Sequence, residues 1–228
     1  ECKLITPETS YFREEWIKYF GLGESELEPP RHEMRVVYVI DPVPPPSALQ
    51  LKTGMLKKDF EAHGVIGTWK GKFFVLELIA NRGHDPSWTT ATFFELCNRW
   101  NPFKVIVESV AYQRTLVWLL REAMKRAARY WMVEEFLDKR SKLDRINQGV
   151  KGPASNGQLY LRKKQSSLVS QFIHYPGKNP DGMHEDELEV LAIGLTSLQK
   201  GYIGEISDNY FQLSEDSIPE LEYERGAP

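Results

Sequence analysis

The sequence predicts an α/β fold in which a mixed β-sheet, a three-stranded antiparallel meander plus parallel strands, has helices on both faces. Three observations support this prediction. Three β-rich runs come first along the chain, later apolar runs alternate with amphipathic segments, and turn residues separate the runs. The 228 residues are 41% hydrophobic and 27% charged, a globular composition with enough chain for one large core.

The first half of the chain predicts the meander. Residues 35–40 are β-branched and stop at Asp41-Pro42, and the Pro-rich stretch after them is excluded from a strand or a helix interior. Residues 60–68 and 72–80 are two further β-rich runs, and the short segment between them contains Gly71, as in a hairpin turn. Three antiparallel strands follow from this spacing.

The second half predicts helices that alternate with strands. Asp85 precedes Pro86 in a helix-start pattern, so we expect a capped helix over 86–100. The apolar run 103–107 ends at Glu108 and suits a strand buried on both faces. The other expected elements are a helix at 11–20, a helix at 112–129, a strand at 131–136, a Gly/Pro/Ser/Asn loop after Asn147, a strand at 158–161, and helices at 166–174 and 185–198. This order is the ribonuclease H-like arrangement, a meander followed by parallel strands with crossover helices.

Charge is distributed unevenly along the chain. The net charge is −3, but residues 121–164 hold twelve Lys or Arg against five acidic residues, and residues 181–228 hold twelve acidic residues against Lys200 and Arg225. The basic segment is a candidate surface for a polyanion, although solvated helix faces have the same composition. No apolar run approaches the ~20 residues that span a bilayer, and Cys2 and Cys97 are too few for a disulfide framework.

Acidic residues lie where the predicted elements begin or end. Asp41 ends the first strand of the meander, Glu108 ends the strand at 103–107, and Glu185 and Asp186 open the last helix. Because neighbouring strand ends meet at one edge of an α/β sheet, we expect Asp41 and Glu108 to lie side by side. Crowded carboxylates repel one another and favour hard divalent cations such as Mg²⁺ or Mn²⁺, and two such ions can hydrolyse a phosphodiester.

Each of these acids also has a purely structural interpretation. Asp before Pro is a common turn former, and acids in the first turn of a helix complement the helix dipole. Glu108 is more informative, because an acid that directly follows a fully apolar buried strand needs a partner.

Five segments together resemble the C-terminal nuclease domain of the large terminase, the DNA-packaging motor subunit of tailed bacteriophages. RVVYVIDP (35–42) is similar to the family's strand that ends in a catalytic Asp, and FKVIVESVAYQRTLVWLL (103–120) to its strand-Glu-helix segment. LKKDFEAHGVIG (56–67) resembles the second strand, and KLDRI (142–146) the Lys-x-x-Arg-Ile element. FIHYPGKNPDGMHEDELEVLAIGL (172–195) looks like the closing helix with its His-Asp-Asp-x-x-Asp-Ala motif. The likeness covers about residues 11–198.

The resemblance implies catalytic, metal-binding roles for Asp41, Glu108 and an acid of the closing helix. There the chain departs from the family, because it has Glu185, Asp186 and Glu189 where aspartates are expected. We take Asp186 as the first choice for the third metal ligand, Glu185 as the second and Glu189 as the third. The basic segment then supplies contacts to DNA phosphates, chiefly from Lys139, Lys142, Arg145 and Lys151.

The expected function is therefore a Mg²⁺- or Mn²⁺-dependent endonuclease that uses two ions to cut double-stranded concatemeric viral DNA during genome packaging. Its implied partners are DNA, the ATPase domain of the full-length chain, the portal and the small terminase subunit, in the host cytoplasm and not at a membrane. No Gly-x-x-x-x-Gly-Lys-Ser/Thr loop occurs. We therefore expect 1–33 to be a linker remnant from a missing ATPase domain, 34–200 the nuclease domain and 201–228 an acidic tail. The Pro-rich residues 42–58 are a candidate flap over the site.

Two other functions fit the same residues. Another ribonuclease H-like nuclease, such as a junction resolvase or an integrase-type recombinase, shares the acidic strand ends but prefers a different form of DNA. A catalytically degenerate interaction module of a packaging complex keeps the fold and binds no metal. The glutamates at 185 and 189 are the feature that favours degeneracy.

Overall fold

A seven-stranded mixed sheet organises the chain in the computed structural model, which describes residues 11–21, 27–44, 52, 60–82, 85–108, 113–136, 138–177 and 185–199. Its strands are β1 (Lys18–Tyr19), β2 (Arg35–Asp41), β3 (Glu61–Trp69), β4 (Lys72–Asn81), β5 (Lys104–Glu108), β6 (Val133–Phe136) and β7 (Leu159–Leu161). The helices are α2 (Pro86–Trp100), α3 (Gln113–Ala127), α4 (Lys142–Ser155), α5 (Ser166–His174) and a last helix at 186–199, which we call the C-terminal helix. Two 3-10 turns, η1 (Glu14–Trp16) and η2 (Arg31–Glu33), precede β1 and β2.

The strand order across the sheet is β1-β7-β4-β3-β2-β5-β6. β2, β3 and β4 form an antiparallel meander, and its hairpin turn, Lys70-Gly71, has positive φ angles of 48° and 72°. Two positive φ angles are typical of a type I′ turn, whose twist matches that of the flanking strands. β5 is parallel to β2, β6 to β5, and β7 to β4. The predicted ribonuclease H-like sheet, a meander plus parallel strands, is confirmed.

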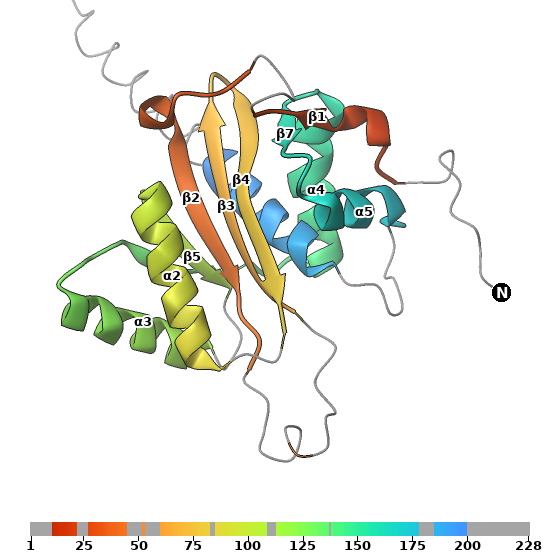
Figure 1. Ribbon diagram of the computed structural model, residues 1–228. Helices are drawn as coiled ribbons and strands as arrows, with labels where there is room; N and C mark the ends of the chain where they lie inside the picture. The colour runs from red at the N-terminus through yellow and green to blue at the C-terminus, as the bar shows by residue number, and fades with distance from the viewer. Residues whose placement is uncertain are drawn as a thin grey trace, which may run out of the picture.

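Helices cover both faces of the sheet and make two hydrophobic cores (Figure 1). Because side chains alternate along a strand, Val37 and Val39 of β2 pack toward α4, α5 and the C-terminal helix. Tyr38 and Ile40 pack on the opposite side, toward α2 and α3. Alternate residues of β2 therefore belong to different cores, one on each face of the sheet.

The N-terminal segment differs from its prediction. Residues 11–20 form η1 and then β1 instead of a helix, and β1 pairs in parallel with β7. Phe12 and Phe20 are buried, and the Phe12 ring stacks on Phe172 at a centroid distance of 4.6 Å. The aromatic spacing thus reflects packing onto α5 and the sheet. Residues 11–21 pack against the sheet and α5, and the assignment of residues 1–33 as a linker remnant stays a prediction.

α4 takes the place of a predicted loop. The glycines and Pro153 after Asn147 predict a break, but the helix continues to Ser155. Gly149 lies against the C-terminal helix, where an added Cβ would be 3.0 Å from the Ala192 carbonyl oxygen. Close packing between the two helices therefore overrides the weak helix propensity of this segment.

Two predicted segments, the acidic tail at 201–228 and most of the flap at 42–58, lie outside the described residues. Within the described part of the chain, no helix is both long enough and apolar enough to cross a membrane.

Candidate metal centre

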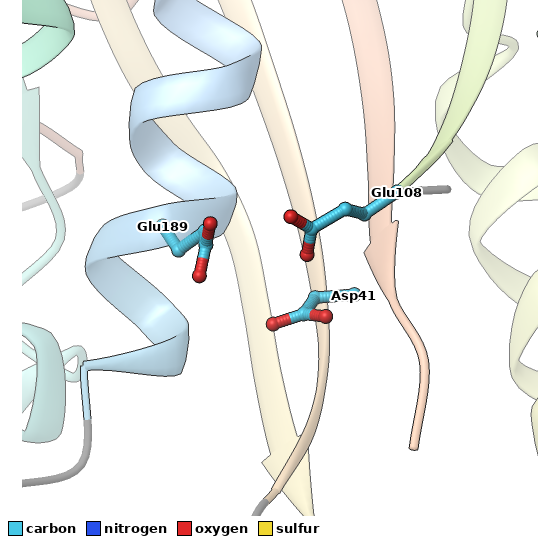
Figure 2. A group of neighbouring side chains, drawn as sticks. All are labelled: Asp41, Glu108 and Glu189. Carbon is cyan, nitrogen blue, oxygen red and sulfur yellow. The ribbon is translucent and has the colours of Figure 1, made fainter. Parts of the chain in front are cut away.

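Three carboxyl groups meet where β2 and β5 end. Asp41 ends β2, Glu108 ends β5, and Glu189 extends from the C-terminal helix. One oxygen of each carboxyl lies within 4.8 Å of the others, and Figure 2 shows the three groups directed into the same space. The expectation that Asp41 and Glu108 lie side by side is confirmed.

Two glycines hold the C-terminal helix close to the sheet. A Cβ at Gly64 of β3 would be 2.3 Å from Cγ1 of Val190, and one at Gly194 would be 2.6 Å from Cδ1 of Ile66. Real Cβ contacts are not this short, so only glycine permits the helix to lie directly on β3. This close packing places Glu189 opposite the ends of β2 and β5.

The Asp41 carboxyl is buried beside a group of like charge. Burial raises its pKa well above the usual range, and the charge of Glu108 together with a hydrogen bond between the two carboxyls raises that pKa further. The Glu189 side chain is only 3% exposed. The neutral form of the Asp41 carboxyl is therefore favoured more than in a free carboxylic acid, and a bound cation would favour the ionised form.

Two cations of α4 contact these acids. Arg145 Nη2 donates to Glu108 Oε1 at 2.6 Å and also to Glu189 Oε1, while Arg145 Nη1 donates to the carbonyl oxygen of Arg140 at 3.3 Å. Lys142 Nζ lies 2.7 Å from Glu189 Oε2. The i, i+3 spacing of Lys142 and Arg145 puts both side chains on the same side of α4.

Negative charge is in excess at this centre. Besides Glu189, Lys142 Nζ lies 3.3 Å from Asp186 Oδ1 and 3.9 Å from Glu185 Oε1. These residues, with Asp41 and Glu108, make five carboxyl groups against two cations, so among the described residues three negative charges stay uncompensated when every carboxyl is ionised. Burial raises the pKa of Glu185. A donor set made only of carboxylate oxygens, with excess negative charge, suits a hard divalent cation such as Mg²⁺ or Mn²⁺.

The third acid beside Asp41 and Glu108 is Glu189, the last of the three sequence-based choices. Asp186, the first choice, lies three residues earlier in the helix, and its Oδ2 accepts a hydrogen bond from the Phe60 N–H at 3.4 Å. One sequence signal favours Glu189. It lies inside the apolar run of a buried helix, and a buried acid among apolar neighbours needs a partner, as Glu108 does.

The predicted DNA-binding residues divide into two pairs. Lys142 and Arg145 lie within the acidic centre, as described above. Lys139 is exposed just before α4, and Lys151 is exposed on α4 with its Nζ 4.6 Å from the centre of the Tyr11 ring. Lys139 and Lys151 are exposed, whereas Lys142 and Arg145 are partly buried and contact the acids.

Arg140 is a positioning residue that sequence analysis did not single out. Its guanidinium pairs with Asp138, with Nη2 and Oδ2 2.5 Å apart, and donates to Gln148 Oε1 at 2.8 Å. Hydrogen bonds from Arg140 hold the pKa of Asp138 at about 2. Because the Arg140 carbonyl accepts from Arg145, this anchored residue helps to orient Arg145. No local pattern in the sequence predicts that contact.

A second buried acid lies on the opposite face of the sheet. His63 Nε2 is 2.8 Å from Glu61 Oε1, and His63 Nδ1 is 2.5 Å from the Tyr38 hydroxyl. The edge of the Trp88 ring faces His63, with ring centroids 5.3 Å apart. Tyr38 donating to Nδ1 and Nε2–H donating to Glu61 satisfies all three side chains at once.

Known structures were compared with this fold. No protein-family model and no curated protein matches the sequence. The large terminase nuclease from thermophilic phage G20c has a TM-score of 0.53 and 11% identity, over 80% of this chain and 95% of that one. The human cytomegalovirus terminase nuclease domain, soaked with Mn and bound to an inhibitor, has a TM-score of 0.53 and 11% identity, over 79% and 88%. The large terminase of a second thermophilic bacteriophage has a TM-score of 0.50 and 10% identity, over 72% and 40%.

Sequence identities near 11% establish the fold and leave the chemistry to the residues of this chain. The resemblance found from the sequence motifs agrees with the structural likeness. The chain therefore has the ribonuclease H-like fold of the viral large terminase nuclease domains.

Proposed function

We propose that the protein is a metal-dependent nuclease that hydrolyses phosphodiester bonds in double-stranded DNA. The observation that supports this most is the meeting of Asp41, Glu108 and Glu189 at the strand ends, with oxygens within 4.8 Å of one another and negative charge in excess. Buried structural acids are normally paired with a cation, and in the described part of the chain this centre has more carboxyls than cations.

Asp41, Glu108 and Glu189 would hold one divalent ion. Asp186, the first sequence-based choice, and Glu185 are the carboxylates available for a second ion, because both share Lys142 with Glu189. A divalent cation held there would supply a nucleophilic water at neutral pH and stabilise the leaving oxygen. The chain's own part is to release the proton of Asp41, to fix the carboxylate oxygens and to hold the phosphate.

The finer role we propose is that of a large terminase nuclease, an endonuclease that cuts concatemeric viral DNA during packaging in the host cytoplasm. Support comes from the extent of the likeness, which spans 95% of the phage G20c nuclease and 40% of the large terminase of the second phage. An ATPase domain, a portal and a small terminase subunit would then be its partners. Mg²⁺ or Mn²⁺ is the expected cofactor.

DNA would lie along α4. Lys139 and Lys151 are exposed there, and Lys142 and Arg145 lie between them in sequence and reach the metal centre. A row of cations beside a hydrolytic site positions a phosphate backbone without reading bases, which suits cleavage with little sequence preference.

One observation favours a second function. The side-chain nitrogens of Lys142 and Arg145 already contact carboxylates of the centre, as in a protein that has replaced metal by internal cations. Such a protein would be an interaction module of a packaging complex without catalysis.

Plasmid cleavage tests the proposal. Supercoiled plasmid is incubated with the purified chain in Mn²⁺, Mg²⁺, Ca²⁺ or EDTA, beside Asp41→Asn and the matched control Glu135→Gln, an exposed acid of β6. Nicking that needs Mn²⁺ or Mg²⁺, persists in the control and disappears in Asp41→Asn supports the nuclease. A wild-type chain that binds no metal and cuts nothing supports the interaction module. Preferential cutting of four-way junctions over linear duplex would instead indicate a resolvase.

A further inference from the structure

Lys142 and Arg145 contact the same carboxylates that form the candidate metal centre. Arg145 Nη2 contacts both Glu108 and Glu189, and Lys142 Nζ contacts Glu189 at 2.7 Å. Asp41 is the one carboxyl of the three that forms no ion pair among the described residues, and it is the one with the strongly raised pKa. In the protein alone, internal cations thus compensate part of the charge that a metal would compensate.

A divalent ion and these two cations compete for the same oxygens. A metal ion bound by Glu108 and Glu189 would repel a guanidinium and an ammonium group at hydrogen-bond distance, and it would neutralise the charge that attracts them. The two side chains then need another anion. Arg145 Nε is buried without a hydrogen-bond partner, so the present contacts leave one of its charged donors unused.

The nearest anion that the reaction supplies is the DNA phosphate. The Lys142 side chain is 33% exposed, against 12% for Arg145, so Lys142 has more open space toward solvent. In Arg145, Nη1 donates to the Arg140 carbonyl oxygen and Nη2 contacts the carboxylates, so Nη2 is the group that metal binding would release. A guanidinium fork and a flexible ammonium group are both suited to phosphate oxygens.

We propose that Lys142 and Arg145 are an electrostatic switch, paired with the acidic centre when metal is absent and released to DNA phosphates when metal binds. The inference rests on the proposed metal-dependent function and adds its regulation. Without metal, the protein binds DNA only through outer cations such as Lys139. With metal, the centre gains two phosphate contacts, so the metal-bound form that can cleave DNA is also the form that binds DNA more tightly.

The test is the salt dependence of DNA binding by the full chain. Anisotropy of a labelled 30-base-pair duplex is measured from low to high KCl in EDTA and in Ca²⁺, a hard cation that takes oxygen ligands. Because each phosphate contact contributes about 0.9 to the slope of log K against log salt, two new contacts should steepen the wild-type slope by about 1.8 on adding Ca²⁺. This comparison needs no variant and does not depend on a variant's folding.

Three variants assign the change to particular side chains. Lys142→Gln and Arg145→Gln should each lose about half of the Ca²⁺-dependent steepening, that is about 0.9. The matched control Lys139→Gln alters an exposed lysine that has no ion pair in the described part of the chain. It should lower the slope equally in EDTA and in Ca²⁺ and leave the steepening unchanged.

Two results would overturn the switch and one would overturn the function beneath it. If the wild-type slope is the same in EDTA and Ca²⁺ although calorimetry detects Ca²⁺ binding, or if Lys142→Gln and Arg145→Gln keep the full steepening, the switch is wrong and the nuclease stands. If calorimetry detects no Ca²⁺ or Mn²⁺ binding at all, the proposed metal-dependent function fails and the switch fails with it.

Discussion

Asp41 and Glu61 lie on opposite faces of the sheet, and only Asp41 belongs to a cluster of several acids. Asp41 pairs with Ala62 in the β2–β3 ladder, and Glu61, the residue before Ala62, faces the opposite side with His63. Glu61 is the single carboxyl of its group, and the hydrogen bonds of His63 with Glu61 and with Tyr38 satisfy all three side chains. Asp41 instead shares its site with Glu108 and further acids, which outnumber the cations that contact them among the described residues.

Burial of an acid does not by itself mark a functional site. Both acids are held by rigid strands, and both would cost free energy if left unpaired. What distinguishes the Asp41 face is that several carboxyls share it and outnumber the cations that contact them among the described residues. Substitutions on the two faces should therefore have effects that differ in size and in their dependence on metal.

Arg145→Met should be the most destabilising change in the absence of metal. Removing one partner of a buried ion pair costs about 3–5 kcal/mol, because Glu108 and Glu189 are left facing each other. Urea denaturation in EDTA measures this loss. In saturating Mg²⁺ much of it should be recovered, since the ion compensates the same carboxylates.

The matched control for this change is Arg126→Met, which removes an exposed arginine of α3. Its free energy of unfolding should stay within about 0.5 kcal/mol of wild type. If Arg145→Met were no more destabilising than Arg126→Met, the pairing of Arg145 with the acidic centre would be wrong.

His63→Phe should destabilise the other face by about 1–3 kcal/mol, because Glu61 and the Tyr38 hydroxyl lose their buried partner. Unlike the change at Arg145, this loss should be the same in EDTA and in Mg²⁺. The rate of plasmid cleavage per folded molecule should not change. A loss that Mg²⁺ reverses would mean that the two faces are not independent.

Asp41→Asn should stabilise the metal-free protein at neutral pH. In the unfolded chain this carboxyl ionises near pH 4, about its usual pKa, whereas its pKa in the folded protein is raised. Unfolding between those two pKa values releases a proton, so the free energy of unfolding falls as pH rises through that window. Because Asn cannot ionise, this fall in the free energy of unfolding does not occur in the variant.

The measurement is urea denaturation of wild type and Asp41→Asn in EDTA at pH 3 and pH 7. Asp41→Asn should have a higher free energy of unfolding than wild type at pH 7 and the same value at pH 3. Glu135→Gln should match wild type at both pH values. A destabilised Asp41→Asn at pH 7 would mean that Asp41 is an ordinary paired acid.

Asp138→Asn should have the smallest effect, below about 1 kcal/mol, because the pair with Arg140 is partly exposed. The lowered pKa of Asp138, about 2, means that its contribution is present above pH 4 and is lost as pH falls toward 2. A pH series of thermal melts on wild type and variant checks the sign. Equal melting temperatures at pH 6 and a lower one for the variant only at pH 2 would contradict it.

The strand ends were predictable from the sequence, whereas the acid of the C-terminal helix that lies beside them was not. Asp41 and Glu108 each follow an uninterrupted apolar run, and a parallel pair of strands brings its ends together whatever the rest of the chain does. The choice between Asp186 and Glu189 depends on how the C-terminal helix lies on β3. That is set by the contacts of Gly64 and Gly194, which are far apart in sequence.

Two elements were missed for a similar reason. β1 exists because Phe12 and Phe20 pack onto distant parts of the chain, and α4 continues through Pro153 because Gly149 seats it against the C-terminal helix. Both depend on tertiary contacts that local propensity does not report. The excess of Lys and Arg in the basic segment was likewise evident from the sequence, but the contacts of Lys142 and Arg145 with the acidic centre were not.

Mn²⁺ binding to the wild type, Glu189→Gln and Asp186→Asn tests whether Asp41, Glu108 and Glu189 hold a divalent ion. Calorimetry is done at pH 7 in two buffers of different ionisation enthalpy, so that proton release is measured with affinity. The wild type should bind Mn²⁺ and release a proton. Glu189→Gln should lose most of the affinity for Mn²⁺, and Asp186→Asn should lose less. Wild-type binding that survives in Glu189→Gln and disappears in Asp186→Asn would contradict this assignment.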